Sequence, residues 1–253
     1  MLNIGLTSVT FRGLSASEII KYCCDCGISS IEWGSDVHVP EGDIENALAV
    51  KAECDKNGIT VSSYGSYYKC GEYEDAEETF KKYVDVAKAL GAPTIRIWVG
   101  NANYEDATEE YIEAIVAELK TICDMAAKEN IEIGCEFHQG SLCNNSAHSL
   151  DIVKRVDRGN FGMYFQFDPN DSVDENVNTL KSFLPILKNV HVFNYQQGAR
   201  YFLNELNGVE MWNEYVRVLK ENNISTTLMF EFLKNPTYEG LLEETKILKS
   251  IIG

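Results

Sequence analysis

The feature of this sequence that most constrains its fold is a regular alternation between two kinds of segment. Short runs rich in β-branched and aromatic residues predict strands, and longer stretches between them carry apolar residues at helical spacing. The predicted strands are Ile4–Thr10, Ser29–Trp33, Thr60–Tyr64, Thr94–Val99, Ile131–Phe137, Phe161–Asp168, Asn189–Asn194 and Thr226–Phe232. The predicted helices are Ala16–Cys26, Ile44–Asn57, Glu74–Leu90, Glu105–Glu129, Ser146–Val156, Val173–Leu187, Val209–Asn222 and Tyr238–Ile251.

This repetition of strand–helix units predicts a parallel sheet covered by helices, which is the α/β class. Such units fill 253 residues without a linker or a break in composition, so we expect a closed (β/α)8 TIM barrel that spans residues 1–253 as a single domain. An open doubly wound sheet is the alternative, but the stretch after the first predicted strand lacks the G-x-G-x-x-G fingerprint of dinucleotide-binding sheets. Ser15, Asp43, Thr108 and Ser146 are the expected N-caps of four of the helices.

The charge balance excludes several kinds of partner. The chain has 22 Lys and Arg against 39 Asp and Glu, a net charge of −17. Because nucleic-acid binding depends on cations that neutralise phosphates, we expect neither nucleic acid nor an anionic membrane as a partner. No segment has the roughly 18 apolar residues of a membrane span, and the first residues do not form a signal peptide. We therefore expect a cytoplasmic protein whose eight cysteines are reduced thiols.

Polar side chains gather where the predicted strands end, which is the edge at which TIM barrels place their chemistry. These residues are Glu32, His38, Arg96, Trp98, Glu136, His138, Gln166, Asp168, His191 and Glu231. Side chains alternate across a strand, so Glu136 and His138 share one face of their strand. If that face points into the barrel, two glutamates, an imidazole and an Asp or Gln converge at one end of it.

Such a convergence predicts a metal site. Glu136, His191 and Glu231, completed by Asp168 or Gln166, offer the oxygen and nitrogen donors that suit one divalent cation such as Mn²⁺, Zn²⁺, Co²⁺ or Mg²⁺. A cation would also offset the cost of crowding buried carboxylates. A single Glu at a strand end is usually a solvated loop residue, and a lone His usually belongs to the core. Possible metal ligands at the ends of four consecutive strands favour one shared metal site over four unrelated roles.

Other residues at the strand ends are candidate substrate contacts. They are Glu32, His38, Arg96, Trp98 and His138. Ion pairs inside a barrel would produce the same pattern of Glu32 and Arg96, so the two interpretations stay open. Trp98 is expected in the wall of the barrel or against the face of a sugar.

With these residues placed, the whole chain resembles the xylose isomerase-like TIM barrel superfamily, in particular its sugar phosphate isomerase/epimerase branch. The segments that carry the resemblance are GISSIEWGSDVH, GAPTIRIWVGN, EIGCEFHQGSL, NVHVF and FEF. The resemblance implies that Glu136, His191 and Glu231 are metal ligands, and that the two glutamates form the acid–base pair. It also implies substrate contacts for Arg200 and His38. Relatives present an Asp and then a His at strand six, whereas this chain offers Gln166 in one register or Asp168 in another.

The resemblance implies a metal-dependent isomerase or epimerase that moves a proton next to the carbonyl of a ketose through an enediolate. The substrate would be a small sugar or sugar phosphate, and a homo-oligomer is compatible with the family, in which oligomers are common. Two alternatives remain open: an inosose-dehydratase-like lyase at the same metal, and a catalytically silent sugar-binding barrel. Endonuclease activity, also found in the superfamily, conflicts with only four His residues and the acidic charge.

Overall fold

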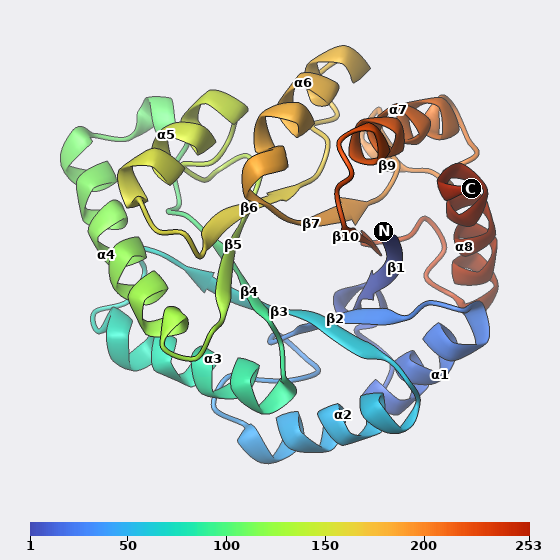
Figure 1. Ribbon diagram of the computed structural model, residues 1–253, viewed down its shortest axis with the longest axis horizontal. Coiled ribbons are helices and arrows are strands. Elements are labelled where there is room, and N and C mark those ends of the chain that lie inside the picture. Colours follow the sequence, from blue (N-terminus) through green and yellow to red (C-terminus); the bar gives the residue numbers. More distant parts are fainter.

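The computed structural model describes residues 1–253 and is a closed barrel of parallel strands surrounded by helices (Figure 1). The strands follow the order β1-β10-β7-β6-β5-β4-β3-β2 around the barrel. They are β1 (Leu2–Thr7), β2 (Ser30–Gly34), β3 (Thr60–Lys69), β4 (Thr94–Trp98), β5 (Glu132–Glu136), β6 (Phe161–Phe165), β7 (Leu187–Val192) and β10 (Thr226–Phe230). The (β/α)8 fold predicted from the alternation of segments is therefore confirmed.

The helices lie outside the barrel, and one helix follows each of its strands in the chain. They are α1 (Ala16–Cys26), α2 (Ile44–Lys56), α3 (Ala76–Leu90), α4 (Glu109–Ala127), α5 (Ser146–Val156), α6 (Val173–Phe183), α7 (Gly208–Glu221) and α8 (Tyr238–Ile252). Short 3₁₀ turns follow β1 as η1 (Ser8–Phe11), precede α4 as η2 (Tyr104–Asp106) and precede β7 as η3 (Leu184–Ile186). The predicted bounds of α1 and α5 are those observed.

Side-chain caps explain where several helices begin. Three of the predicted caps accept a hydrogen bond from a backbone N–H of the first turn, namely Ser15, Asp43 and Thr108. The prediction for α5 is wrong by one residue. Its cap is Asn145, whose side chain accepts from the N–H of His148, while Ser146 is already helical.

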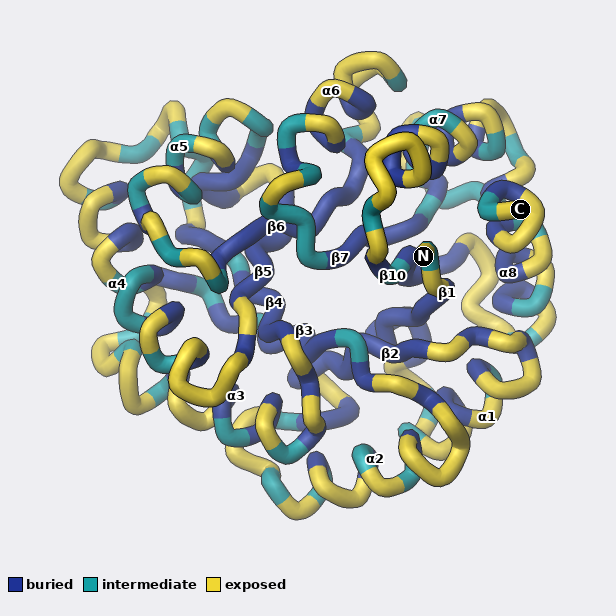
Figure 2. The backbone as a smooth tube through the Cα atoms, viewed as in Figure 1, coloured by how far each residue is buried: buried dark blue, intermediate teal, exposed yellow.

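Burial follows the layers of the barrel (Figure 2). The strands are buried in their central parts, and each helix exposes its outer face. One apolar cluster of 66 buried residues fills the space within and around the sheet. No helix is both long enough and apolar enough to cross a membrane.

The largest departures from the predicted strands occur at the carboxyl ends, which we call the mouth of the barrel. β1 ends at Thr7 instead of Thr10, because the chain continues into η1. β6 ends at Phe165 instead of Asp168. β3 extends to Lys69, and its pairing with β4 shifts register between Gly65 and Lys69. The backbone at the mouth thus leaves regular sheet geometry where the polar residues lie.

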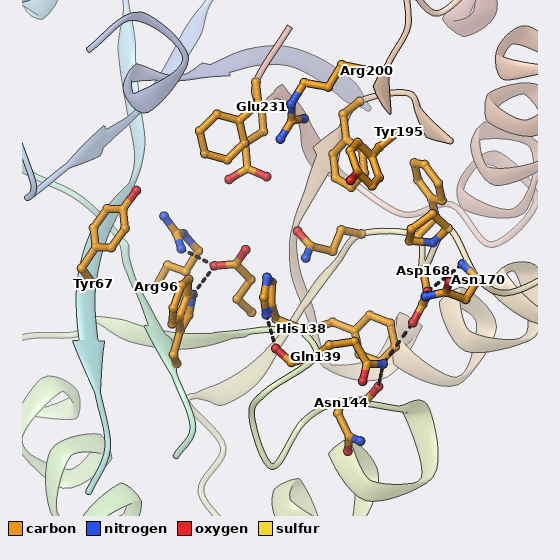
Figure 3. A pocket seen from close by; sticks show the side chains of 18 of the residues that line it. Tyr67, Arg96, His138, Gln139, Asn144, Asp168, Asn170, Tyr195, Arg200 and Glu231 are labelled. Carbon is orange, nitrogen blue, oxygen red and sulfur yellow. Dashed lines mark hydrogen bonds and ion pairs between the residues drawn. The ribbon is translucent and has the colours of Figure 1, made fainter. Parts of the chain in front are cut away.

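A small antiparallel hairpin adds to the mouth between β7 and α7. It consists of β8 (Tyr195–Gln196) and β9 (Ala199–Arg200). Gln197 and Gly198 form its turn, with φ values of 52° and 76°. Positive φ at both central residues is the conformation of a two-residue turn that matches strand twist. The hairpin carries Arg200 to the mouth (Figure 3).

Candidate functional site

A cavity of about 520 Å³ opens at the mouth of the barrel (Figure 3). Eight residues singled out from the sequence line it: Arg96, Trp98, Glu136, His138, Gln166, Asp168, Arg200 and Glu231. His191 lies beneath them and is fully buried. Because these residues come from β4, β5, β7, the segments that follow β6 and β10, and the hairpin, only barrel closure brings them together.

Glu136, His191 and Glu231 share one centre. One donor atom from each residue lies within 4.8 Å of the others, and all three side chains are buried. Glu136 is the last residue of β5, His191 belongs to β7, and Glu231 directly follows β10. The backbone N–H of Glu231 donates to the carbonyl of Val192 at 3.0 Å, which continues the pairing of β10 with β7. The convergence expected from the sequence is thus present.

The structure places Gln166, and not Asp168, beside this centre. The amide oxygen of Gln166 lies 3.2 Å from Nδ1 of His191, and an oxygen of Glu231 lies 3.4 Å from the same nitrogen. Asp168 lies in the outer part of the cavity, where its carboxylate accepts from Gln139 at 3.1 Å and from the side chain of Asn170 at 2.9 Å. The chain turns out of the barrel after Phe165, so the two-residue shift that would make Asp168 a ligand does not occur.

Arg96 holds two of the buried carboxylates. Its Nε donates to Glu32 at 2.9 Å, and its Nη1 donates to Oε2 of Glu136. Ser63 donates to the other oxygen of Glu32 at 2.7 Å. Both Glu32 and Arg96 are at most 2% exposed. Glu32 therefore lies below the cavity as the partner of an internal ion pair, and the structure does not place it as a direct substrate contact.

The two glutamates of the centre have opposite electrostatic environments. Burial disfavours ionised Glu136, but the charge of Arg96 outweighs this and lowers the pKa of Glu136 below its ordinary value. Burial raises the pKa of Glu231, and the neighbouring charge of Glu136 raises it further. Glu231 accepts no hydrogen bond that would compensate its burial apart from the contact with His191. The surroundings of Glu136 thus favour its ionised form, whereas those of Glu231 favour its protonated form.

The donor set fits a divalent cation. When Glu32, Glu136 and Glu231 are all ionised and His191 is neutral, the positive charge of Arg96 leaves two of the three negative charges uncompensated. One divalent cation has the charge that cancels them. Glu136 has one oxygen engaged by Arg96 and Trp98, which leaves its other oxygen for a ligand bond. Gln166 supplies a neutral fourth donor.

Trp98 connects the centre to the cavity wall. Its indole Nε1 donates to Glu136, and its ring stacks on that of His138 with a centroid separation of 5.3 Å and an interplanar angle of 15°. Lys69 lies 5.1 Å from the centroid of the Trp98 ring. Trp98 therefore orients a carboxylate at the centre and holds His138 against the cavity.

His38 does not line the cavity. It is 7% exposed, its Nε2 lies 3.1 Å from the carbonyl oxygen of Leu14, and its ring packs edge-on against Trp33. The expectation of a substrate contact is not met, because the loop after β2 folds this side chain behind η1. Its position is that of a packing residue.

Tyr67 and Phe232 are cavity residues that the sequence analysis did not identify. Both have left-handed backbone conformations, with φ values of 55° and 52°. Aromatic residues adopt this conformation at a cost, and such strain is concentrated at functional sites. The only local signal was position: Phe232 adjoins Glu231, and Tyr67 lies three residues beyond the predicted end of its strand.

The barrel and its centre of carboxylates and imidazole define a recognised class of protein. The sequence matches the xylose isomerase-like TIM barrel family over residues 20–251, so the chain belongs to this family. A 3-dehydroshikimate dehydratase from Bacillus anthracis is 19% identical over 258 residues, which cover 99% of this chain and 87% of the relative.

Solved structures show the same fold. A probable 3-DHS dehydratase from Bacillus anthracis has a TM-score of 0.78 at 16% identity and covers 98% of each chain. A D-psicose 3-epimerase, crystallised in the presence of D-fructose, has a TM-score of 0.77 at 15% identity and covers 99% of this chain and 100% of its own. A D-allulose 3-epimerase from Methylomonas sp. has a TM-score of 0.75 at 18% identity, with 99% and 96% covered. The relatives with named activities are enzymes, which supports an enzymatic role for this chain.

Proposed function

We propose that the protein is a divalent-metal-dependent isomerase or epimerase that moves a proton at the carbon next to the carbonyl of a polyhydroxy ketone. The observation that carries the proposal is the buried centre of Glu136, His191 and Glu231, whose donor atoms lie within 4.8 Å of one another. These residues, with Gln166, would hold the cation. When bound, a cation such as Mn²⁺ supplies Lewis-acid polarisation of the carbonyl.

The two glutamates have different roles in this proposal. Glu231 has a raised pKa and few hydrogen-bond partners, so it is the group that removes the proton next to the carbonyl. Glu136 is oriented by Arg96 and Trp98; once it has taken up a proton from water, it delivers that proton to the carbon from its side of the cavity. Because β5 and β10 are separated by β6 and β7 around the barrel, the two carboxylates approach the substrate from different directions.

The first test is proton exchange in deuterated water. Purified protein loaded with Mn²⁺ is incubated with D-fructose, D-psicose and 3-dehydroshikimate, and deuterium incorporation is followed by mass spectrometry. We expect incorporation into at least one ketone. Glu231→Gln should abolish it, because the amide cannot remove a proton, and Glu136→Gln should lower both exchange and metal content.

A matched control is Glu113→Gln, because Glu113 is exposed on α4 and does not line the cavity. It should retain wild-type metal content and exchange. If Glu136→Gln and Glu231→Gln together changed neither metal content nor exchange, the proposed centre would be misplaced.

A second candidate function is a lyase that removes water after the same proton abstraction. It is favoured by the similarity to the 3-dehydroshikimate dehydratase along 99% of this chain. The product mass separates the two functions, since dehydration removes one water molecule and epimerisation leaves the mass unchanged. Loss of water with catalytic turnover would assign the lyase.

A further inference from the structure

The six arginines of the chain differ in how their charge is compensated. Five form ion pairs with carboxylates: Arg12, Arg96, Arg155, Arg158 and Arg217. Arg200 forms none, and its guanidinium makes no hydrogen bond with the protein. In a chain with 39 acidic residues, an arginine without a carboxylate partner is an exception that requires a reason.

Arg200 lies in the wall of the cavity, on strand β9 of the hairpin (Figure 3). Its guanidinium carbon lies 4.6 Å from the centroid of the Phe232 ring and 5.6 Å from that of Tyr195. These rings attract the cation, but they do not satisfy the in-plane N–H donors of the guanidinium. The side chain is therefore oriented in advance, and its hydrogen-bond donors are left for a ligand.

Burial of the charged Arg200 side chain also has an electrostatic cost. Burial lowers the pKa of its guanidinium from the ordinary value, and the charge of Glu231 offsets only part of this effect. Arg200 and Glu231 are not within ion-pair distance, since no N–O separation of 4.0 Å or less joins them. A ligand with a negative charge would remove the cost by pairing with the guanidinium.

The number of free charges indicates which anion fits. Arg12 also lines the cavity, and its guanidinium lies 5.4 Å from the ring of Phe232. It is already paired with Asp36 at 2.5 Å and bonded to the hydroxyl of Tyr67 at 2.7 Å. A single uncompensated guanidinium matches a single negative charge, and its planar fork matches a carboxylate. A phosphate dianion would lack a second free cation to balance its second charge.

We propose that Arg200 binds a carboxylate of the substrate, so that the cavity takes a carboxylated polyhydroxy ketone in preference to a neutral ketose. This inference rests on the proposed function, because the glutamates act on the ketone while Arg200 holds the other end. Arg200 and the two glutamates line the same cavity of about 520 Å³, so one molecule bound there can contact all three.

Calorimetric binding to metal-free protein tests the proposal without turnover. The probes are 3,4-dihydroxybenzoate and its uncharged isostere 3,4-dihydroxybenzamide, which share a ring and two adjacent oxygens and differ in charge. We expect the wild-type protein to bind the acid at least tenfold more tightly than the amide. In Arg200→Gln the preference should fall below threefold, and Arg200→Lys should retain an intermediate preference.

Arg217→Gln is the matched control, because Arg217 lies on α7 and pairs there with Glu214 and Glu221. It should keep the wild-type preference, and circular dichroism checks that each variant is folded. Equal binding of acid and amide by the wild-type protein would overturn the proposal. So would an unchanged preference in Arg200→Gln, or failure of both probes to bind at millimolar concentration.

Competition with inorganic phosphate distinguishes the two kinds of anion. If phosphate displaced the benzoate at concentrations below the Kd of the benzoate itself, the site would be a phosphate site and the carboxylate assignment would be wrong. The outcomes are separable from those of the proposed function. An anion preference at Arg200 without deuterium exchange would reject the reaction, and exchange without the preference would reject the carboxylate.

Discussion

Nδ1 of His191 lies 3.2 Å from the amide oxygen of Gln166. One imidazole nitrogen therefore faces the neutral amide oxygen of Gln166, at the position where members of this family are expected to carry Asp. Its other nitrogen, Nε2, has no hydrogen-bond partner and lies 3.8 Å from Glu32. This arrangement gives the centre four possible ligands, of which only Glu136 and Glu231 can carry a negative charge.

A charged residue in place of Gln166 should bind a cation more tightly. Gln166→Glu conserves the size of the side chain and adds one negative charge, which strengthens the attraction for a divalent cation. We expect the Kd for Mn²⁺ to fall at least tenfold, measured by calorimetric titration. Gln166→Met is the matched variant without a charged or amide oxygen, and it should weaken binding. Equal Kd values for all three proteins would exclude Gln166 from the cation site.

The ion pairs of Arg96 should be necessary for stability. Arg96→Met leaves Glu32 and Glu136 buried without their cation, and loss of one partner of a buried ion pair costs about 3–5 kcal/mol. We expect a decrease of this size in the free energy of unfolding, measured by urea denaturation in the absence of divalent cations. Arg217→Met removes exposed ion pairs and should change stability by less than about 1 kcal/mol. Similar values for both variants would contradict the internal role of Arg96.

Glu244 should make the stability depend on pH. Burial in α8 raises its pKa to about 7, although the backbone N–H of Leu203 donates to it at 3.1 Å. Between about pH 4.5 and pH 7 the folded protein retains a proton that the unfolded chain has lost. Stability therefore falls as pH rises through this window and stays lower above it.

Glu244→Gln removes this penalty and keeps an oxygen for Leu203. We expect the variant to be more stable than the wild type by about 3 kcal/mol at pH 8, and by much less at pH 4.5. Urea denaturation at both pH values measures the difference. The same difference at the two pH values would show that ionisation of Glu244 does not cause the effect.

Gly162 should be required by the close approach of another backbone segment. A Cβ atom at this position in β6 would lie 2.1 Å from the carbonyl oxygen of Ile186, and backbone cannot move aside as a side chain can. We expect Gly162→Ala to lower the free energy of unfolding by about 1–3 kcal/mol. Gly159→Ala is the control, because no heavy atom lies within 4 Å of its added Cβ. Thermal and urea denaturation of both variants compare the two sites.

Hydrophobic spacing and capping residues are properties of neighbouring positions, which is why they could be read without coordinates. They determined the strand–helix alternation, the bounds of α1 and α5, and the caps Ser15, Asp43 and Thr108. The side-chain period of two and the chemistry of strand ends also indicated Glu136 and Glu231. Such signals arise from residues within a few positions of one another, and the local helix or strand geometry that they indicate is the one found in the folded protein.

Tertiary structure alone decided the partners of these groups. Arg96 meets Glu32 across 64 positions of the sequence and Glu136 across 40, and Gln166 meets His191 across 25. It also decided that Asp168 and His38 lie away from the centre, and that Arg200 stays unpaired beside Phe232. These contacts depend on the register of closed strands and on where each strand bends at the mouth. Neighbouring residues do not specify that register, because it is set by packing of the whole barrel.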